Sequence, residues 1–95
     1  MQQKNLHIIM PVKDSILMTE KAIRAIVASG NNVCVFDDYS TDANAQRLDE
    51  LARELNIQVV HISDLTDHPS PNYRFVLQTA QQRALTENKH LVIVE

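Results

Sequence analysis

The 95-residue chain has few of the residue types on which several common kinds of site depend. It has one glycine, Gly30, whereas the dinucleotide-binding turn and the phosphate-binding loop each need several glycines to let the backbone approach a phosphate. It has one cysteine, Cys34, which has no internal disulfide partner and, inside an apolar run, is predicted to be a buried thiol. There is no tryptophan, and no apolar run approaches the roughly 20 residues that span a bilayer. Glycine-rich phosphate sites and internal disulfides are therefore excluded for these residues.

Positive charge is also scarce. The chain carries 9 Lys and Arg residues against 12 Asp and Glu residues, and the basic residues are scattered rather than clustered. We therefore expect no nucleic-acid partner. The first residues lack the charged-then-apolar layout of a signal peptide, so we expect a cytoplasmic protein.

The histidines show no spacing typical of metal ligands, either with one another or with Cys34. Three of the four fall at predicted strand positions and are expected to be half-buried structural side chains: His7, His61 and His90. No metal site is predicted within this chain.

Predicted strands and helices alternate along the chain. Apolar runs predict four strands, at 6–12, 32–36, 57–62 and 91–94. Apolar residues at helical spacing predict three helices between them, at 15–29, from 40–42 to 56, and at 73–87, with Ser15 placed to cap the first. This order predicts an α/β fold: a Rossmann-like three-layer sandwich with a four-stranded, mostly parallel sheet and helices on both faces, in one domain over 1–95.

Two adjacent carboxylates, Asp37 and Asp38, follow the second predicted strand. The carboxyl ends of the strands are where open α/β sheets bind their ligands. Asp38 can accept a hydrogen bond from the imide N–H of a uracil or from an amino group of another base, and Asp37 can bind backbone or ribose. Alternatively, both carboxylates cap the turn into the second helix, together with Ser40 and Asp42.

Three charged residues accompany this pair. Arg74 opens the third predicted helix, although helix N-termini favour anions, and its planar guanidinium suits a base carbonyl or a phosphate. The alternative is a surface ion pair with Asp64 or Asp67. Lys13 and Asp14 follow the first strand, where Lys13 can reach a phosphate; charged residues at such exits are commonly just solvated.

Four segments together resemble the family 2 glycosyltransferases, which have the GT-A fold. Segment 8–14 is similar to the opening strand of that family, and segment 35–42 to its signature apolar-apolar-Asp-Asp-x-Ser-x-Asp. Segment 72–74 resembles the part that carries a base-contacting arginine. Segment 91–94 resembles the strand that leads into the Asp-x-Asp metal motif.

The resemblance implies a binding site for a nucleotide-sugar donor, a UDP-sugar in the first place. In it, Asp38 would bind the base, Asp37 would support the loop, and Arg74 would contact the base or a phosphate. The residues expected to bind the nucleotide are Pro11, Val12, Lys13, Asp14, Asp37, Asp38 and Arg74. Family members transfer the sugar to an acceptor hydroxyl, with Mg²⁺ or Mn²⁺ on the Asp-x-Asp motif assisting departure of the diphosphate.

The sequence stops at Glu95, before the expected Asp-x-Asp motif and catalytic base. We therefore expect the front part of a longer GT-A transferase, inactive by itself, with the divalent cation bound in the full-length protein and not by this fragment. The competing interpretation is a non-catalytic Rossmann-like module that binds a nucleotide or a protein partner. A phospho-receiver domain is disfavoured, because its acidic pair follows the first strand. The uncovered flank of a four-stranded sheet also allows self-association through an edge strand.

Overall fold

A parallel sheet forms the middle layer of the protein. In the computed structural model, which describes residues 6–95, its strands are β1 (Leu6–Val12), β2 (Cys34–Asp37), β3 (Gln58–His61) and β4 (His90–Ile93). They lie in the order β3-β2-β1-β4, and each neighbouring pair is parallel. β1 and β2 are therefore central, while β3 and β4 form the edges.

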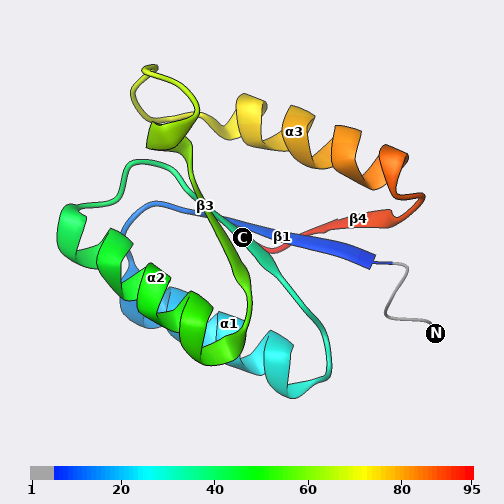
Figure 1. Ribbon diagram of the computed structural model, residues 1–95, viewed down its shortest axis with the longest axis horizontal. Coiled ribbons are helices and arrows are strands. Elements are labelled where there is room, and N and C mark those ends of the chain that lie inside the picture. Colours follow the sequence, from blue (N-terminus) through cyan, green and yellow to red (C-terminus); the bar gives the residue numbers. More distant parts are fainter. Residues whose placement is uncertain (1–5) are drawn as a thin grey trace.

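Helices cover both faces of this sheet. α1 (Ile16–Ala28) and α2 (Asp42–Leu55) lie side by side on one face, and α3 (Tyr73–Thr86) lies on the other (Figure 1). The predicted three-layer α/β fold is confirmed, and the element bounds agree with those predicted to within about two residues. One short element, the 3₁₀ turn η2 (Ile62–Asp64), begins the segment that was predicted to be a loop throughout.

Each face of the sheet has its own apolar core, because successive side chains of a strand point to opposite faces. Ile8 belongs to the cluster under α1 and α2, in which Ile23, Leu48 and Leu51 are fully buried. Ile9, its neighbour, belongs to the cluster under α3. The α3 residues buried in that second cluster are Val76 and Ala80.

The C-terminal ends of the first two helices have a regular form, whereas the N-terminal cap predicted for α1 is not made. Gly30 and Asn56 follow α1 and α2 with φ of 85° and 55°, the left-handed conformation that ends many helices. Ser15 is the residue before α1, as predicted, but its own φ is 49° and its side chain makes no capping hydrogen bond. The left-handed backbone of Ser15 differs from the usual N-cap conformation, in which the side-chain oxygen reaches the first turn.

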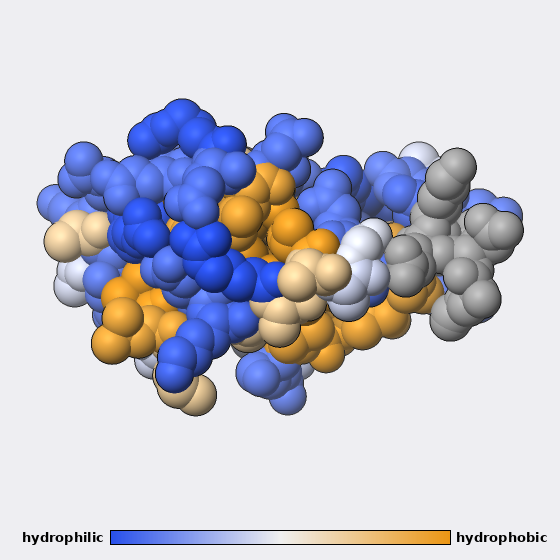
Figure 2. All heavy atoms as spheres, turned by 90° about the horizontal axis from the view of Figure 1, so that it is seen from below, coloured by the Kyte–Doolittle hydropathy of each residue, from blue (hydrophilic) through white to orange (hydrophobic). Residues whose placement is uncertain are grey.

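Seen from the side of α1 and α2, the surface is largely hydrophilic, with apolar side chains gathered in patches (Figure 2). The large apolar side chains most exposed on α1 are Leu17 and Met18. Among residues 6–95, no helix combines the length and the apolar character needed to cross a membrane.

Candidate functional site

The loops that leave β1 and β2 are bound to each other at the carboxyl edge of the sheet. The backbone N–H of Asp38 donates to the carbonyl of Val12 at 2.8 Å. One residue further along each loop, the Lys13 ammonium donates to the carbonyl of Tyr39 at 3.2 Å. The backbone N–H of Asp14 donates to the Ser40 hydroxyl at 2.7 Å. The two loops that sequence analysis assigned to one edge therefore form a single structure.

A pocket of about 400 Å³ opens at this edge, between the exit of β1, the start of α1 and the residues after β4. Pro11, Val12, Lys13 and Asp14 all line it. Its other walls come from α1 and from Val94 and Glu95. We call it the carboxyl-edge pocket. Four of the seven residues predicted to bind a nucleotide thus surround one cavity.

Asp14 joins this pocket to α2. Its carboxylate oxygen Oδ1 accepts hydrogen bonds from the side chain of Asn44 and from the backbone of Thr41, both at 2.9 Å. Both hydrogen bonds lower the pKa of Asp14, and the bond from Asn44 has the larger effect. The ionised Asp14 carboxylate therefore connects the exit of β1 to the start of α2 through these hydrogen bonds.

Strained backbone is concentrated at the same edge. Asp14, Ser15 and Tyr39 have φ of 57°, 49° and 64°, although none of them is glycine. A left-handed conformation costs such residues about 1–2 kcal/mol each. Strain of this kind is found preferentially at functional sites, where the surrounding structure holds it in place.

Asp38 lies behind the pocket, not in its lining, and is only 9% exposed. Its Oδ2 accepts from the Asn72 backbone at 2.7 Å and from the Ser70 hydroxyl at 3.0 Å. Its Oδ1 accepts from the Asn72 side chain at 2.8 Å. Burial opposes ionisation, but the hydrogen bonds from Asn72 and Ser70 outweigh it, and the pKa of Asp38 is lowered. Because a carboxylate oxygen accepts about two hydrogen bonds, Oδ1 retains capacity for one more.

Asp37 has a different environment. Its Oδ1 accepts from the Ser40 backbone at 3.1 Å, so Asp37 caps the turn into α2, which was the alternative to a nucleotide contact. Its Oδ2 lies 2.7 Å from Nδ1 of His61. Asp37 also lines a second pocket, of about 360 Å³, between β2, β3 and α2.

His61 bridges two carboxylates in that second pocket. Its other ring nitrogen, Nε2, lies 2.7 Å from Oδ1 of Asp49 on α2. Burial lowers the pKa of His61, but the hydrogen bonds to Asp49 and Asp37 raise it by more, so the net shift is upward. Sequence analysis predicted only a half-buried strand histidine here. The missed signal lies in the strand register, which pairs Asp37 with His61 directly.

Arg74 lies apart from both pockets, exposed in the first turn of α3. Within residues 6–95 it forms no ion pair, so the predicted alternative of a pair with Asp64 or Asp67 is not made. It follows Asn72, the partner of Asp38, by two residues. The chain thus brings Arg74 to the helix end that Asp38 anchors.

Comparison with known proteins adds no relative to this picture: no family model, no curated protein and no solved structure matches the chain. The likeness to family 2 glycosyltransferases rests on the residues of the four segments. What the structure contributes is their arrangement: Lys13 and Asp14 line one cavity, and Asp38 lies directly behind its wall.

Proposed function

We propose that the carboxyl-edge pocket binds the nucleoside diphosphate part of a sugar nucleotide, with uracil as the base. The protein would then be the donor-binding part of a glycosyltransferase that moves a sugar to an acceptor hydroxyl. The observation that carries this proposal is the pocket itself, a 400 Å³ cavity at the exit of β1 with Lys13 in its lining and Asp38 bonded to its wall. Carboxyl ends of parallel strands are the usual ligand site of such sheets.

The charges at this edge suit a nucleotide. Within the described residues, the Lys13 ammonium makes one hydrogen bond, to Tyr39, and has three N–H donors, so two remain for phosphate oxygens. The free capacity of Asp38 Oδ1 suits the imide N–H of uracil, but because Asp38 is buried behind the pocket lining, the base would have to displace part of that wall to reach it. Arg74 is exposed at the start of α3, outside the pocket lining, so it would serve as a planar donor only to a part of the ligand that extends beyond the pocket.

The divalent cation that the resemblance implies does not fit residues 6–95. Among them, no group of three or more His, Cys, Asp or Glu side chains is arranged to hold a metal ion. The Glu95 carboxylate lines the pocket, but it accepts a hydrogen bond from the Tyr73 hydroxyl at 3.1 Å. We therefore derive no metal-assisted step, and we assign these residues to donor binding only.

Nucleotide titration tests this proposal. Isothermal calorimetry with UDP is expected to give saturable binding, with uridine weaker and ADP weaker than UDP. Lys13→Gln should weaken UDP binding about tenfold, the loss expected when one charge-assisted hydrogen bond to phosphate is removed, and should leave uridine binding unchanged. Lys21→Gln, which removes an exposed lysine of α1 outside the pocket lining, is the matched control. Absence of saturation with UDP, or equal effects of the two variants, would overturn the assignment.

One observation favours the alternative of a non-catalytic module. Both carboxylates of the acidic pair are engaged by the protein itself: Asp37 with Ser40 and His61, and Asp38 with Ser70 and Asn72. If these bonds are their whole role, UDP and uridine will both fail to bind, and Asp38→Asn will change stability alone.

A further inference from the structure

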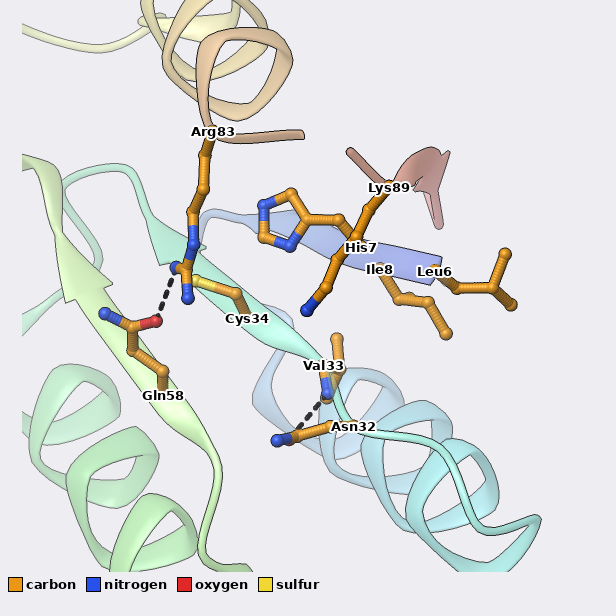
Figure 3. Close-up of a pocket in the computed structure, with 9 residues that line it drawn as sticks. All are labelled: Leu6, His7, Ile8, Asn32, Val33, Cys34, Gln58, Arg83 and Lys89. Atoms are coloured by element: carbon orange, nitrogen blue, oxygen red, sulfur yellow. Dashed lines mark hydrogen bonds between the residues drawn. The ribbon is translucent and has the colours of Figure 1, made fainter. Parts of the chain in front are cut away.

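A third pocket, also lined by charged residues, lies at the opposite end of the sheet, where the strands begin. Its volume is about 100 Å³, and it is lined by the first residues of β1, by residues 32–34 and by the side chains of Gln58, Arg83 and Lys89 (Figure 3). Because all strands are parallel, this amino-edge pocket is separated from the carboxyl-edge pocket by the length of the sheet. The proposed nucleotide site does not use it.

Two cations face this cavity. The Arg83 guanidinium donates through Nη1 to Oε1 of Gln58 at 2.8 Å and through Nε to Glu87 at 3.1 Å. The Lys89 ammonium lies 3.3 Å from the other carboxylate oxygen of Glu87. One acid therefore balances two cations, which leaves an excess of positive charge. Both cations also have more N–H donors than these contacts use.

A buried histidine forms the floor of the pocket. His7 is 6% exposed, and its Nε2 has no hydrogen-bond partner among residues 6–95. Figure 3 shows its imidazole between the side chains of Arg83 and Lys89. Burial first, and then the charge of Arg83, lower the pKa of His7, so the ring is neutral near pH 7 and carries one N–H donor. Among residues 6–95 no hydrogen bond to the side chain of His7 decides which ring nitrogen is protonated, so the neutral ring can carry its proton on the nitrogen that the bound group needs.

The thiol beside these groups does not make the pocket a reaction centre. Cys34 is buried next to Arg83, and burial raises its pKa to about 11, so the thiolate that a nucleophile requires is not formed. The amino-edge pocket thus offers donors and positive charge without a reactive group. Such a lining is suited to binding an anion.

We propose that the amino-edge pocket binds a single phosphate-type oxyanion, held by Arg83, Lys89 and His7. A cavity of about 100 Å³ suits one tetrahedral oxyanion and is too small for a nucleoside. Arg83 and Lys89 supply charge-assisted hydrogen bonds, which are the strongest that proteins make to phosphate. In the complex, Nε2 of His7 gains the partner that it lacks among residues 6–95.

Nuclear magnetic resonance of the whole chain tests this assignment. Inorganic phosphate, added at constant ionic strength against chloride, should shift the imidazole resonances of His7 in a saturable way. Arg83→Gln and Lys89→Gln should each weaken binding by about tenfold or more. The matched control is Arg53→Gln, which removes an exposed arginine in the last turn of α2 and should leave the affinity unchanged.

Two further arms make the outcome decisive. Glycerol phosphate that binds as well as inorganic phosphate would identify a phosphate group carried by a larger molecule, and selective binding of inorganic phosphate would identify the free ion. Should Arg83→Gln fail to fold, Arg83→Lys and the exposed Lys89→Gln carry the test. Shifts that do not saturate, or that chloride reproduces, or that are equal in the Lys89 and Arg53 variants, would overturn the proposal. UDP binding is followed through Lys13, so failure at one edge is distinguishable from failure at the other.

Discussion

Asn72 binds the carboxylate of Asp38 twice, through its backbone N–H at 2.7 Å and through its side-chain amide at 2.8 Å. Asn72 is the residue immediately before α3, so a negative charge lies at the N-terminus of that helix. Helix N-termini favour anions, because their backbone N–H groups lack intrahelical partners. This pair therefore fixes where α3 begins and attaches it to the end of β2.

Replacing Asp38 with asparagine is expected to destabilise the fold by about 1–3 kcal/mol. The change keeps the size of the side chain but replaces an acceptor oxygen with an amide that faces donors of Ser70 and Asn72. Urea unfolding followed by circular dichroism measures the difference. Asp67→Asn, on the exposed loop before α3, is the control and should change stability little. Equal stabilities of the two variants would show that Asp38 does not anchor α3.

The lowered pKa of Asp38 predicts that the stability of the fold decreases in acid. Because the pKa of Asp38 is lower in the folded protein than in the unfolded chain, its contribution to stability is present above the unfolded value, about 4, and is lost as the pH falls through the folded value. The stability difference between the native protein and Asp38→Asn should therefore shrink below about pH 4. A difference that is constant with pH would contradict the ionised pair.

The contribution of His61 to the free energy of unfolding is expected to depend on pH in the opposite sense, because it is lost as the pH rises. Both ring nitrogens lie 2.7 Å from carboxylate oxygens, so the doubly protonated ring serves both Asp37 and Asp49. Its pKa is raised on folding, so its stabilising contribution is complete below the unfolded value, about 6.5, and is lost as the pH rises through the folded value.

The measurement is the free energy of unfolding of native protein and of His61→Gln at about pH 6 and about pH 8.5, on either side of that transition. The native protein should lose its advantage over the variant at the higher pH, while the titration of His7 is common to both proteins and cancels. His90→Gln, at the exposed start of β4, is the matched control. An advantage that grows with pH would show that the ring is neutral between the two acids.

The core of the sheet face under α1 and α2 can be tested with two leucines. Leu51 is fully buried on α2, whereas Leu85 on α3 is 77% exposed. Leu51→Ala should cost about 2–5 kcal/mol, because it removes buried methyl groups and leaves a cavity. Leu85→Ala should change stability by under about 0.5 kcal/mol. Thermal or urea unfolding compares them, and similar losses for both would contradict the layer assignment.

The sequence was sufficient for the layers because their signals are local. Leu48, Leu51 and Leu55 repeat at helical spacing within one segment, and the apolar strands are continuous because both faces of a parallel sheet are covered. The position of Asn56 at the end of α2 follows from its tolerance of a left-handed backbone. Each of these features depends on residues a few positions apart.

The contacts of the sites depend on residues far apart in the sequence. Asp38 and Asn72 are 34 positions apart, and His61 and Asp37 are 24 apart. Only the register of β2 against β3, and the path of the loop before α3, bring them together. For the same reason, the sequence placed Asp37 and Asp38 in one site, whereas the structure gives them separate partners.

One consequence follows from the length of α3. The helix begins at the residue after Asn72, next to the wall of the carboxyl-edge pocket, and carries Arg83 in its last turn, in the amino-edge pocket. The two ends of α3 therefore take part in different cavities, and a substitution that shifts the helix is expected to change the lining of both.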